Sequence, residues 1–585
     1  MSETTAKTGE TEQAVRQILH AALKEAVGPW SEQKRPFGYF VMEDGVRKRS
    51  FGKKAEHVKI TAAPVWITKV LHNLSDGSVT RQIAWQNRDG RVRTYDLSAE
   101  ELSDKKAFAA LIGAADAPFL IAKLADAMDY LQHLYRINDT QLPREYVSDR
   151  LGWVTADAAE KFVYGAESGV SLSPAPSLSR HAQFFASRGT VAGWVEAMKP
   201  ALEKSSRLCL LVLASLASPV LSLVGAPSFT VEVWGKTSSG KTSSLNIAAS
   251  VWGKVGAGSA GLVSSWDNTA YYVEQLLQFH SALPVFLMDC HKAKPEVLED
   301  VSYKLANGFG KGRGQKSGGI RNRATWNCVL LSDGERSLYS VFKNGGAAAR
   351  VLSVHGSPLL RMTASEVHAL VDSALANCGS VGHAYAGLLN SVDKAALRKS
   401  YSDHCERLAL ESSDGVSARS AQYFAAMNVA LEVVCQLPEF SWFASVGRDA
   451  LEAMRLETLK TVTEHSATKD GLSVVADWVS ANPGKFRDLD STDPLVRTFE
   501  PVQLFGYLKN GLVLVLQEEL RKLCEQHFLD LGAMQLEWRD IGALEADRNR
   551  CTKVARIKDR TMRVFAFKHA ALFPDVKNDT GDDDE

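Results

Sequence analysis

Near the middle of the chain stands the sequence Phe229-Thr230-Val231-Glu232-Val233-Trp234-Gly235-Lys236-Thr237-Ser238-Ser239-Gly240-Lys241-Thr242. Its first part, up to Trp234, is rich in β-branched and aromatic side chains and predicts a strand. The rest matches the pattern G-x-x-x-x-G-K-[ST], and the helix-forming stretch Ser243 to Trp252 follows. This order is typical of a P-loop, in which backbone N–H groups surround phosphates at a helix N-terminus. We therefore expect an α/β P-loop NTPase.

The polar residues of this loop have expected roles. Lys241 would reach the β and γ phosphate oxygens, and the Thr242 hydroxyl would help to hold Mg²⁺. The residues expected to bind the nucleotide are Gly235, Ser238, Ser239, Gly240, Lys241, Thr242 and Ser243. A Ser- and Gly-rich surface turn is the alternative, but the flanking strand and helix argue against it. ATP and Mg²⁺ are the expected cofactors.

A second element of the expected site follows about 40 residues later. The apolar stretch Leu283 to Met288 predicts a strand that ends at Asp289, an acid placed to hold Mg²⁺ through water. A hydrolytic ATPase usually has two adjacent acids at this point, whereas Met288 and Cys290 flank a single one here. Either hydrolysis is slow or a nearby acid substitutes, the candidates being Glu296, Glu299 and Asp300.

A third predicted strand, Trp326 to Leu331, ends at Ser332-Asp333-Gly334-Glu335. A polar side chain at this strand end would lie beside the γ-phosphate and could sense it. Ser332 is the first candidate for this sensor and Asn327 the second. An ordinary turn at the end of a strand is the alternative.

Arg350 follows a glycine-rich turn beyond the third strand. An arginine there could reach the γ-phosphate bound by an adjacent subunit, which is the arginine-finger role. Arg336 is the rival candidate, and an ordinary surface arginine is the alternative. The catalytic residues expected from the sequence are thus Lys241, Asp289, Ser332 and Arg350.

The segment Gly308 to Arg323 is basic and rich in glycine. From Gly310 to Arg323 it holds five basic residues and no acid: Lys311, Arg313, Lys316, Arg321 and Arg323. A flexible basic loop suits contact with a nucleic-acid backbone, which requires charge but no fixed base readout. A solvated loop and a loop that touches a neighbouring subunit are the alternatives.

The pattern of predicted helices, strands and turns changes several times along the chain. A Pro- and Ser-rich stretch, Ser171 to Ser179, has the composition of a linker. Basic residues are concentrated near the C-terminus, in the part of the chain expected to form the wing of a winged-helix domain. They are Arg548, Arg550, Lys553, Arg556, Lys558, Arg560 and Arg563. The expected parts are a polar tail and helix (1–30), a β-rich domain with a helical insert (31–170), the ATPase core (180–363), a helical domain (364–465), a winged-helix domain (466–574) and a disordered acidic tail (575–585).

Composition limits the function classes. The 585 residues carry 68 basic and 68 acidic side chains, so a protein that coats nucleic acid throughout is disfavoured and any such contact must be local. The eight cysteines include no C-x-x-C pair, which argues against a disulfide framework or a structural zinc site. The apolar stretch Leu208 to Val224 is interrupted by polar residues and fits a buried helix better than a membrane span. With no secretory signal visible at the start, a cytoplasmic protein is expected.

Several of these segments together resemble one family: the glycine loop with its flanks, Leu283 to Asp289, the basic loop and Leu331 to Glu335. The chain is similar, from about Pro36 to Phe573, to the domain-of-unknown-function 927 family of phage and mobile-element proteins, often labelled helicases and inactivated derivatives. The segment Trp266 to Thr269 with Glu274 also resembles the family. The resemblance implies an AAA+ fold similar to hexameric replicative helicases, with a helical lid and a winged-helix end. The chain departs from it in the single acid at Asp289.

The expected function is that of an ATP-dependent motor. A homo-oligomeric ring, hexameric as the resemblance implies, would pull single-stranded or forked DNA past the basic loop as a helicase for a phage or mobile element. One alternative is a nucleotide-gated DNA-binding or assembly protein whose hydrolysis is impaired. A metabolic or signalling P-loop kinase is the other, and no acceptor-site motif supports it.

Overall fold

The computed structural model describes residues 32–50, 57–87, 89–156, 159–165, 168–256, 260–314, 320–321, 323–340, 342, 349–359, 362–410, 415–464, 467–493, 503–527, 529, 531–548, 550–557 and 560–574. The chain divides into two compact units, Met1–Ala182 and Gln183–Glu585. The predicted tails at 1–30 and 575–585 lie outside the described residues. The finer division expected from the sequence stays a prediction.

The first unit is built around a mixed five-stranded sheet with the order β10-β7-β4-β5-β6. Strands β4 (Val65–Asn73), β5 (Val79–Gln86) and β6 (Val92–Ser98) are antiparallel, whereas β7 (Arg144–Ser148) runs parallel to β4. Strand β10 (Ser171–Leu172) pairs with β7, so the predicted linker begins inside the sheet. A three-stranded sheet, β1 (Tyr39–Met42), β2 (Gly45–Arg49) and β3 (His57–Lys59), and the hairpin β8 (Gly152–Ala156) and β9 (Ala159–Val163) complete the strands.

Helices α2 (Ala99–Ser103), α3 (Lys105–Ala115) and α4 (Leu124–Asn138) separate β6 from β7. Helix α4 packs on β4 because its buried residues recur every three or four positions, at Leu124, Ala127, Tyr130, Leu131 and Leu134. The Tyr130 hydroxyl donates a 2.8 Å hydrogen bond to the backbone oxygen of Val65, which ties the helix to the strand.

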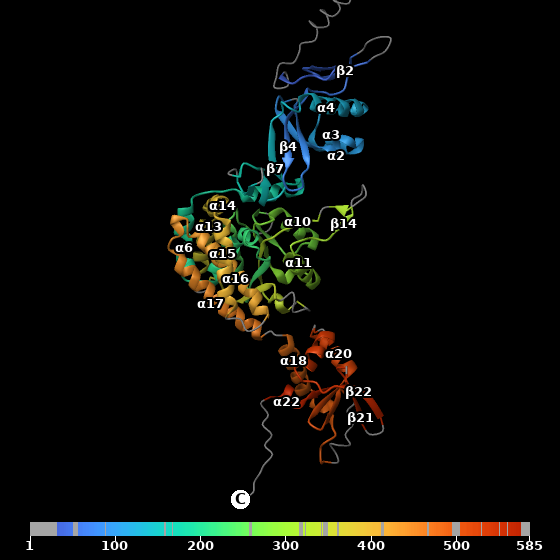
Figure 1. Cartoon of the computed structure of the whole chain (residues 1–585), viewed down its shortest axis with the longest axis vertical. Helices are drawn as coiled ribbons and strands as arrows, with labels where there is room; N and C mark the ends of the chain where they lie inside the picture. The colour runs from blue at the N-terminus through green and yellow to red at the C-terminus, as the bar shows by residue number, and fades with distance from the viewer. Residues whose placement is uncertain are drawn as a thin grey trace, which may run out of the picture. The chain divides into compact units, whose positions relative to one another are not determined.

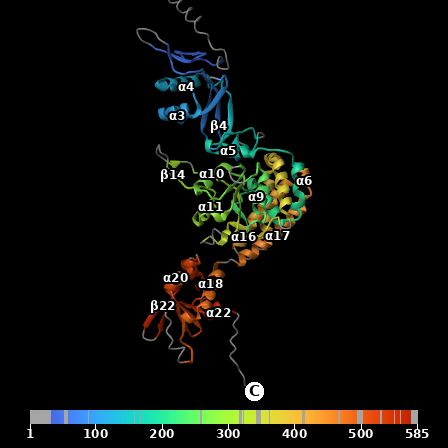
Figure 2. The same ribbon diagram turned by 180° about the vertical axis from the view of Figure 1, so that it is seen from behind.

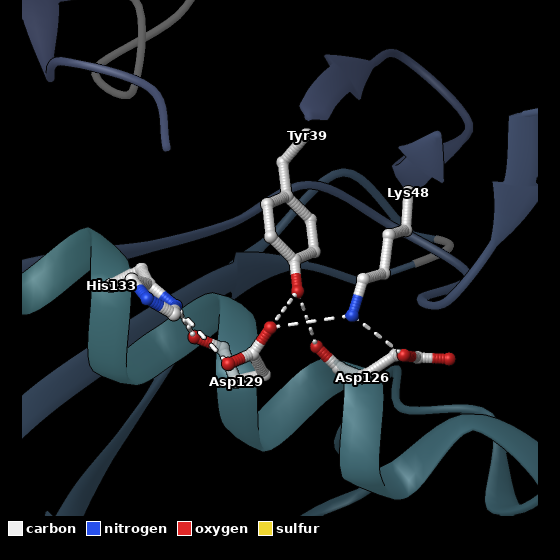
Figure 3. A network of polar contacts seen from close by, with 5 residues as sticks. All are labelled: Tyr39, Lys48, Asp126, Asp129 and His133. Carbon is white, nitrogen blue, oxygen red and sulfur yellow. Dashed lines mark hydrogen bonds and ion pairs between the residues drawn. The ribbon is translucent and has the colours of Figure 1, made fainter. Parts of the chain in front are cut away.

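A polar network joins the outer face of α4 to β1 and β2 (Figure 3). Asp129 accepts a 2.6 Å hydrogen bond from Tyr39 and lies 3.3 Å from the ammonium of Lys48, which also contacts Asp126 at 2.9 Å. His133 lies 3.1 Å from Asp129. Partial burial by itself would raise the pKa of Asp129, but the hydrogen bonds from Tyr39 and Lys48 hold it below its ordinary value.

The second unit contains a parallel sheet with the order β12-β13-β16-β11-β17. Its strands are β11 (Phe229–Trp234), β12 (Val263–Ser265), β13 (Val285–Met288), β16 (Val329–Gly334) and β17 (Val351–His355). The strands are buried along nearly their whole length, as expected for a parallel sheet covered by helices on both faces. The α/β fold expected for this core is confirmed.

Helices surround this sheet (Figures 1 and 2). Helix α9 (Lys241–Ser250) follows β11. Helices α10 (Ala270–His280) and α11 (Pro295–Asn307) lie together, away from the later helices. The later helices are α13 (Ala364–Ala376), α14 (Ser380–Ser391), α15 (Lys394–Ala409), α16 (Gly415–Val434) and α17 (Phe443–Glu464). Helix α6 (Val191–Leu202) packs against α13 and α14.

Helix α7 (Ser206–Ala217) is the centre of this packing, since it contacts β16, α9, α16 and α17. Within the part of the chain that the structure describes, Ser206–Val224 is the one helical stretch long and apolar enough to cross a membrane, and 89% of its most apolar window is buried inside the structure. It is thus placed as a core helix, as its interrupted apolar pattern predicted.

The C-terminal region holds another five-stranded sheet, with the order β18-β19-β20-β22-β21. These strands are β18 (Phe486–Asp488), β19 (Gly506–Lys509), β20 (Leu512–Leu516), β21 (Lys553–Ile557) and β22 (Arg560–Lys568), and they accompany helices α18 (Ala467–Ala481), α20 (Gln517–Gln526), α21 (Leu531–Asp540) and α22 (His569–Leu572). This sheet has more strands than the β-hairpin that usually forms the wing of a winged helix. Asn510 and Gly511 both have positive φ and connect β19 to the apolar run of β20, which is the Asn-Gly hairpin signal.

Candidate active site

The glycine loop between β11 and α9 has a conformation that needs its small residues. Gly235, Ser238 and Gly240 have φ angles of 151°, 57° and 79°. A Cβ atom at Gly240 would lie 3.1 Å from the Leu359 side chain. Gly240 is also the residue before α9, and no side chain caps this helix, so the backbone N–H groups of its first turn are left for a ligand.

Lys241 folds back over this loop and is only 7% exposed. Its ammonium donates to the backbone oxygens of Gly235 at 3.1 Å and Lys236 at 2.6 Å, and lies 3.3 Å from the Ser239 hydroxyl. A buried ammonium surrounded by neutral acceptors is well placed to attract an anion.

The carboxylate of Asp333 connects the glycine loop to the neighbouring strand. One of its oxygens accepts a 2.5 Å hydrogen bond from the Thr242 hydroxyl, and the other accepts a 2.7 Å bond from the Asp289 backbone N–H. Asp333 is 2% exposed, and this burial raises its pKa although both hydrogen bonds oppose the rise. Asp289 itself has a φ of 62° and forms a 2.7 Å ion pair with Lys292.

These groups line one pocket of about 190 Å³. Its lining residues are Thr237, Ser238, Ser239, Gly240, Lys241, Thr242, Ser243, Asp289, His291, Asp333, Gly334 and Glu335. The predicted loop residues and Asp289 therefore come together, with Gly235 at the start of the loop. The substitute acids proposed from the sequence, Glu296, Glu299 and Asp300, do not line this pocket, whereas Asp333 and Glu335 do.

Ser332 and Asn327, the two sensor candidates, point away from the pocket. Ser332 is fully buried, and its hydroxyl accepts a 2.8 Å hydrogen bond from the Trp266 indole. Successive residues of a strand face opposite sides of the sheet, so Asp333 reaches the pocket where Ser332 does not. Asn327 precedes β16 at the other end of the strand, where it binds Ser228 and Ala226.

Arg350 lies at the amino-terminal ends of the strands of the sheet. Its backbone oxygen accepts from Thr230 at 3.0 Å, at the start of β11, whereas the glycine loop follows the end of that strand. Its guanidinium lies 4.9 Å from the ring centre of Tyr303. Arg350 is thus far along the strand from the pocket of its own chain. Arg336, its rival, is exposed one residue beyond the pocket residue Glu335.

The basic loop forms a short hairpin, in which β14 (Arg313–Gly314) pairs with β15 (Ile320–Arg321). Lys311 and Arg323 are exposed. Arg313 instead forms a bidentate contact, at 2.9 and 3.2 Å, with Glu274 of α10, a carboxylate that is 2% exposed. Lys316 lies outside the described residues, and the Arg321 side chain is not described.

Glu232 is a buried carboxylate on the strand that leads into the glycine loop. It accepts hydrogen bonds from the Leu338 backbone N–H at 2.9 and 3.0 Å and from the Ser353 hydroxyl at 2.8 Å, and the Cys290 thiol lies 3.6 Å away. Burial raises its pKa from 4.5 to about 7, although these donors oppose the rise. Glu232 therefore ties the segments that follow Asp289 and Glu335 to β11.

The fold and the pocket define an α/β protein with a glycine loop at a helix N-terminus beside two acidic strand ends. Residues 39–325 match the family described as Domain of unknown function (DUF927). The matched residues include the glycine loop and the Leu283 to Asp289 segment, which confirms the resemblance seen there. No curated protein matches the chain.

The chain also resembles solved structures. One, described as "SCCmec type IV Cch - active helicase", is 15% identical, with a TM-score of 0.66, over 92% of this chain and 98% of that one. The likeness shows a shared fold. A second, "The A form apo structure of NrS-1 C terminal region-CTR", is 10% identical over 85% of this chain and 95% of that one, and its TM-score of 0.31 is too low to support an argument.

Proposed function

We propose that the chain is an ATP-dependent nucleic-acid motor of the AAA+ type, acting as a DNA helicase for a phage or mobile element. The observation that carries this proposal is the convergence of Lys241 and Thr242 with Asp289 and Asp333 around one pocket. An ammonium, a hydroxyl, two carboxylates and free helix N-terminal amides form a donor set that suits a nucleotide phosphate with Mg²⁺. The similarity to a fold described as an active helicase adds support.

Each residue of the pocket would have a distinct role in nucleotide binding and hydrolysis. The glycine loop and Lys241 would bind and orient the phosphates, while Mg²⁺ would neutralise charge that develops on them. Thr242 and Asp289 would hold the metal. Asp333 would orient both of these residues through its two hydrogen bonds, and Glu335 would accept a proton from the attacking water.

A ring of subunits, hexameric in our proposal, fits the position of Arg350. Arg350 lies at the amino-terminal ends of the strands, whereas its own pocket lies at their carboxyl ends. An arginine in this position would therefore serve the pocket of another subunit. The C-terminal hairpin of β21 and β22, with its exposed basic residues, supports a winged-helix module that contacts DNA.

An ATPase assay with and without single-stranded DNA tests the proposal. We expect turnover that DNA stimulates and that Lys241→Ala abolishes. Lys236→Ala, which changes an exposed lysine of the same loop outside the pocket lining, is the matched control and should retain turnover. Turnover that persists in Lys241→Ala would refute the assignment of the pocket.

The second candidate function is a nucleotide-gated DNA-binding or assembly protein. It is favoured by the single acid at the end of β13 and by the ion pair that Asp289 forms with Lys292. This function predicts nucleotide binding at Lys241 and nucleotide-dependent DNA binding without stimulated turnover. A filter-binding assay for both ligands, run beside the ATPase assay, separates the two functions.

A further inference from the structure

Two aromatic side chains are exposed at the base of the hairpin formed by β14 and β15. Tyr271 of α10 is 46% exposed and Phe309, which leads into the hairpin, is 41% exposed. Exposing such large rings to water is unfavourable, and neither ring is needed to fill the core. Both rings are therefore available to a partner.

An arginine guanidinium lies over each ring. The Arg313 guanidinium lies 4.3 Å from the ring centre of Tyr271, and that of Arg323 lies 4.5 Å from the ring centre of Phe309. A guanidinium over an aromatic face is a favourable cation–π contact that fixes the plane of the ring. The same arrangement occurs twice within one small part of the surface.

The buried carboxylate of Glu274 holds these residues in place. It lies one helical turn after Tyr271 on α10, binds Arg313 with both oxygens and has Lys304 of α11 at 3.7 Å. A Cβ atom at Gly310 would lie 2.4 Å from a Glu274 oxygen, so the chain just after Phe309 is pressed against the same carboxylate. Because its charge is offset by a buried partner, Arg313 is suited to positioning the ring rather than to binding a phosphate.

A flat ring, a stacked guanidinium and adjacent exposed basic residues are the features that bind unpaired bases without sequence preference. We propose that Tyr271 and Phe309 form a base-stacking platform for single-stranded nucleic acid, with Arg313 as a positioning residue and Lys311 and Arg323 at the phosphates. This inference rests on the proposed nucleic-acid function and assigns it a binding surface that the basic residues alone do not supply.

The experiment compares a labelled thymidine oligonucleotide with a strand of equal length that lacks bases, using fluorescence anisotropy and the full chain. We expect Tyr271→Ala and Phe309→Ala each to weaken binding of the oligonucleotide by about fivefold to a hundredfold. Neither should alter binding of the abasic strand. Tyr271→Phe should bind like the wild type, and Lys311→Ala should weaken both strands equally because it removes a phosphate contact.

Phe37→Ala is the matched control, since it removes a 91% exposed ring from the first unit. Retained binding of a fluorescent ATP analogue shows that each variant is folded. Equal losses on both strands, or a change in subunit assembly in place of DNA affinity, would overturn the platform. A wild-type chain that binds neither strand would instead overturn the proposed nucleic-acid function itself.

Discussion

Replacing Glu232 by glutamine should change how the stability of the second unit depends on pH. Glu232 is fully buried, and its pKa is raised from 4.5 to about 7. Between these two values the folded protein holds a proton that the unfolded chain has released. The stabilisation from this proton is complete below pH 4.5 and is lost as the pH rises through 7.

The size of the effect follows from the two pKa values. Each pH unit between them corresponds to about 1.4 kcal/mol, so the whole range corresponds to about 3 kcal/mol. Most of it, about 2 to 3 kcal/mol, falls between pH 5 and pH 8. Glutamine keeps a carbonyl that can accept from Leu338 or Ser353 but cannot titrate, so Glu232→Gln should lack this loss.

Urea unfolding of both proteins, followed by tryptophan fluorescence at several pH values, measures the difference. The stability of the wild type relative to Glu232→Gln should fall by about 2 to 3 kcal/mol from pH 5 to pH 8. Glu203→Gln, at an exposed glutamate, should show no such trend. Parallel pH profiles for the wild type and Glu232→Gln would refute a carboxyl that titrates near neutrality.

Three further changes test other parts of the structure. Asp333→Asn should lower ATP turnover about tenfold to a hundredfold, because Asp333 is expected to orient residues that hold the metal. Ser332→Ala should retain turnover, since Ser332 points away from the pocket. Equal effects of the two changes in steady-state assays would contradict the pocket geometry. Arg350→Ala and Lys241→Ala should each be inactive, but an equimolar mixture should regain turnover if Arg350 serves a neighbouring subunit, and no recovery would count against that role. Thr363→Ala removes the capping box of α13 and should cost about 1 kcal/mol in urea unfolding, while Thr363→Ser should cost less.

The local parts of the site could be predicted from the sequence. The glycine loop needs only residues that are close together in the chain, and its strand and helix are visible in the same stretch. Asp289 was likewise predictable, because an apolar run that ends in an acid is a local pattern. The structure brings these residues to one pocket.

Asp333 was missed because its role depends on which strands are neighbours. Strand β16 lies between β13 and β11, and this order places Asp333 beside both Thr242 and Asp289. The sequence Ser332-Asp333 contained a usable signal, since only one of two successive strand residues can face the pocket. The ion pair of Arg313 could not be predicted for a similar reason, because its partner Glu274 lies 39 residues away on helix α10.

The contacts of Lys241 and Asp333 also bear on the ligand exchange that the proposed function would require. Both side chains have polar partners within the chain itself. If the pocket binds a nucleotide as proposed, loading would replace some of these internal partners with ligand atoms, and release would restore them. Exchange of one set of partners for another, in place of local unfolding, would then be enough for repeated cycles of loading and release.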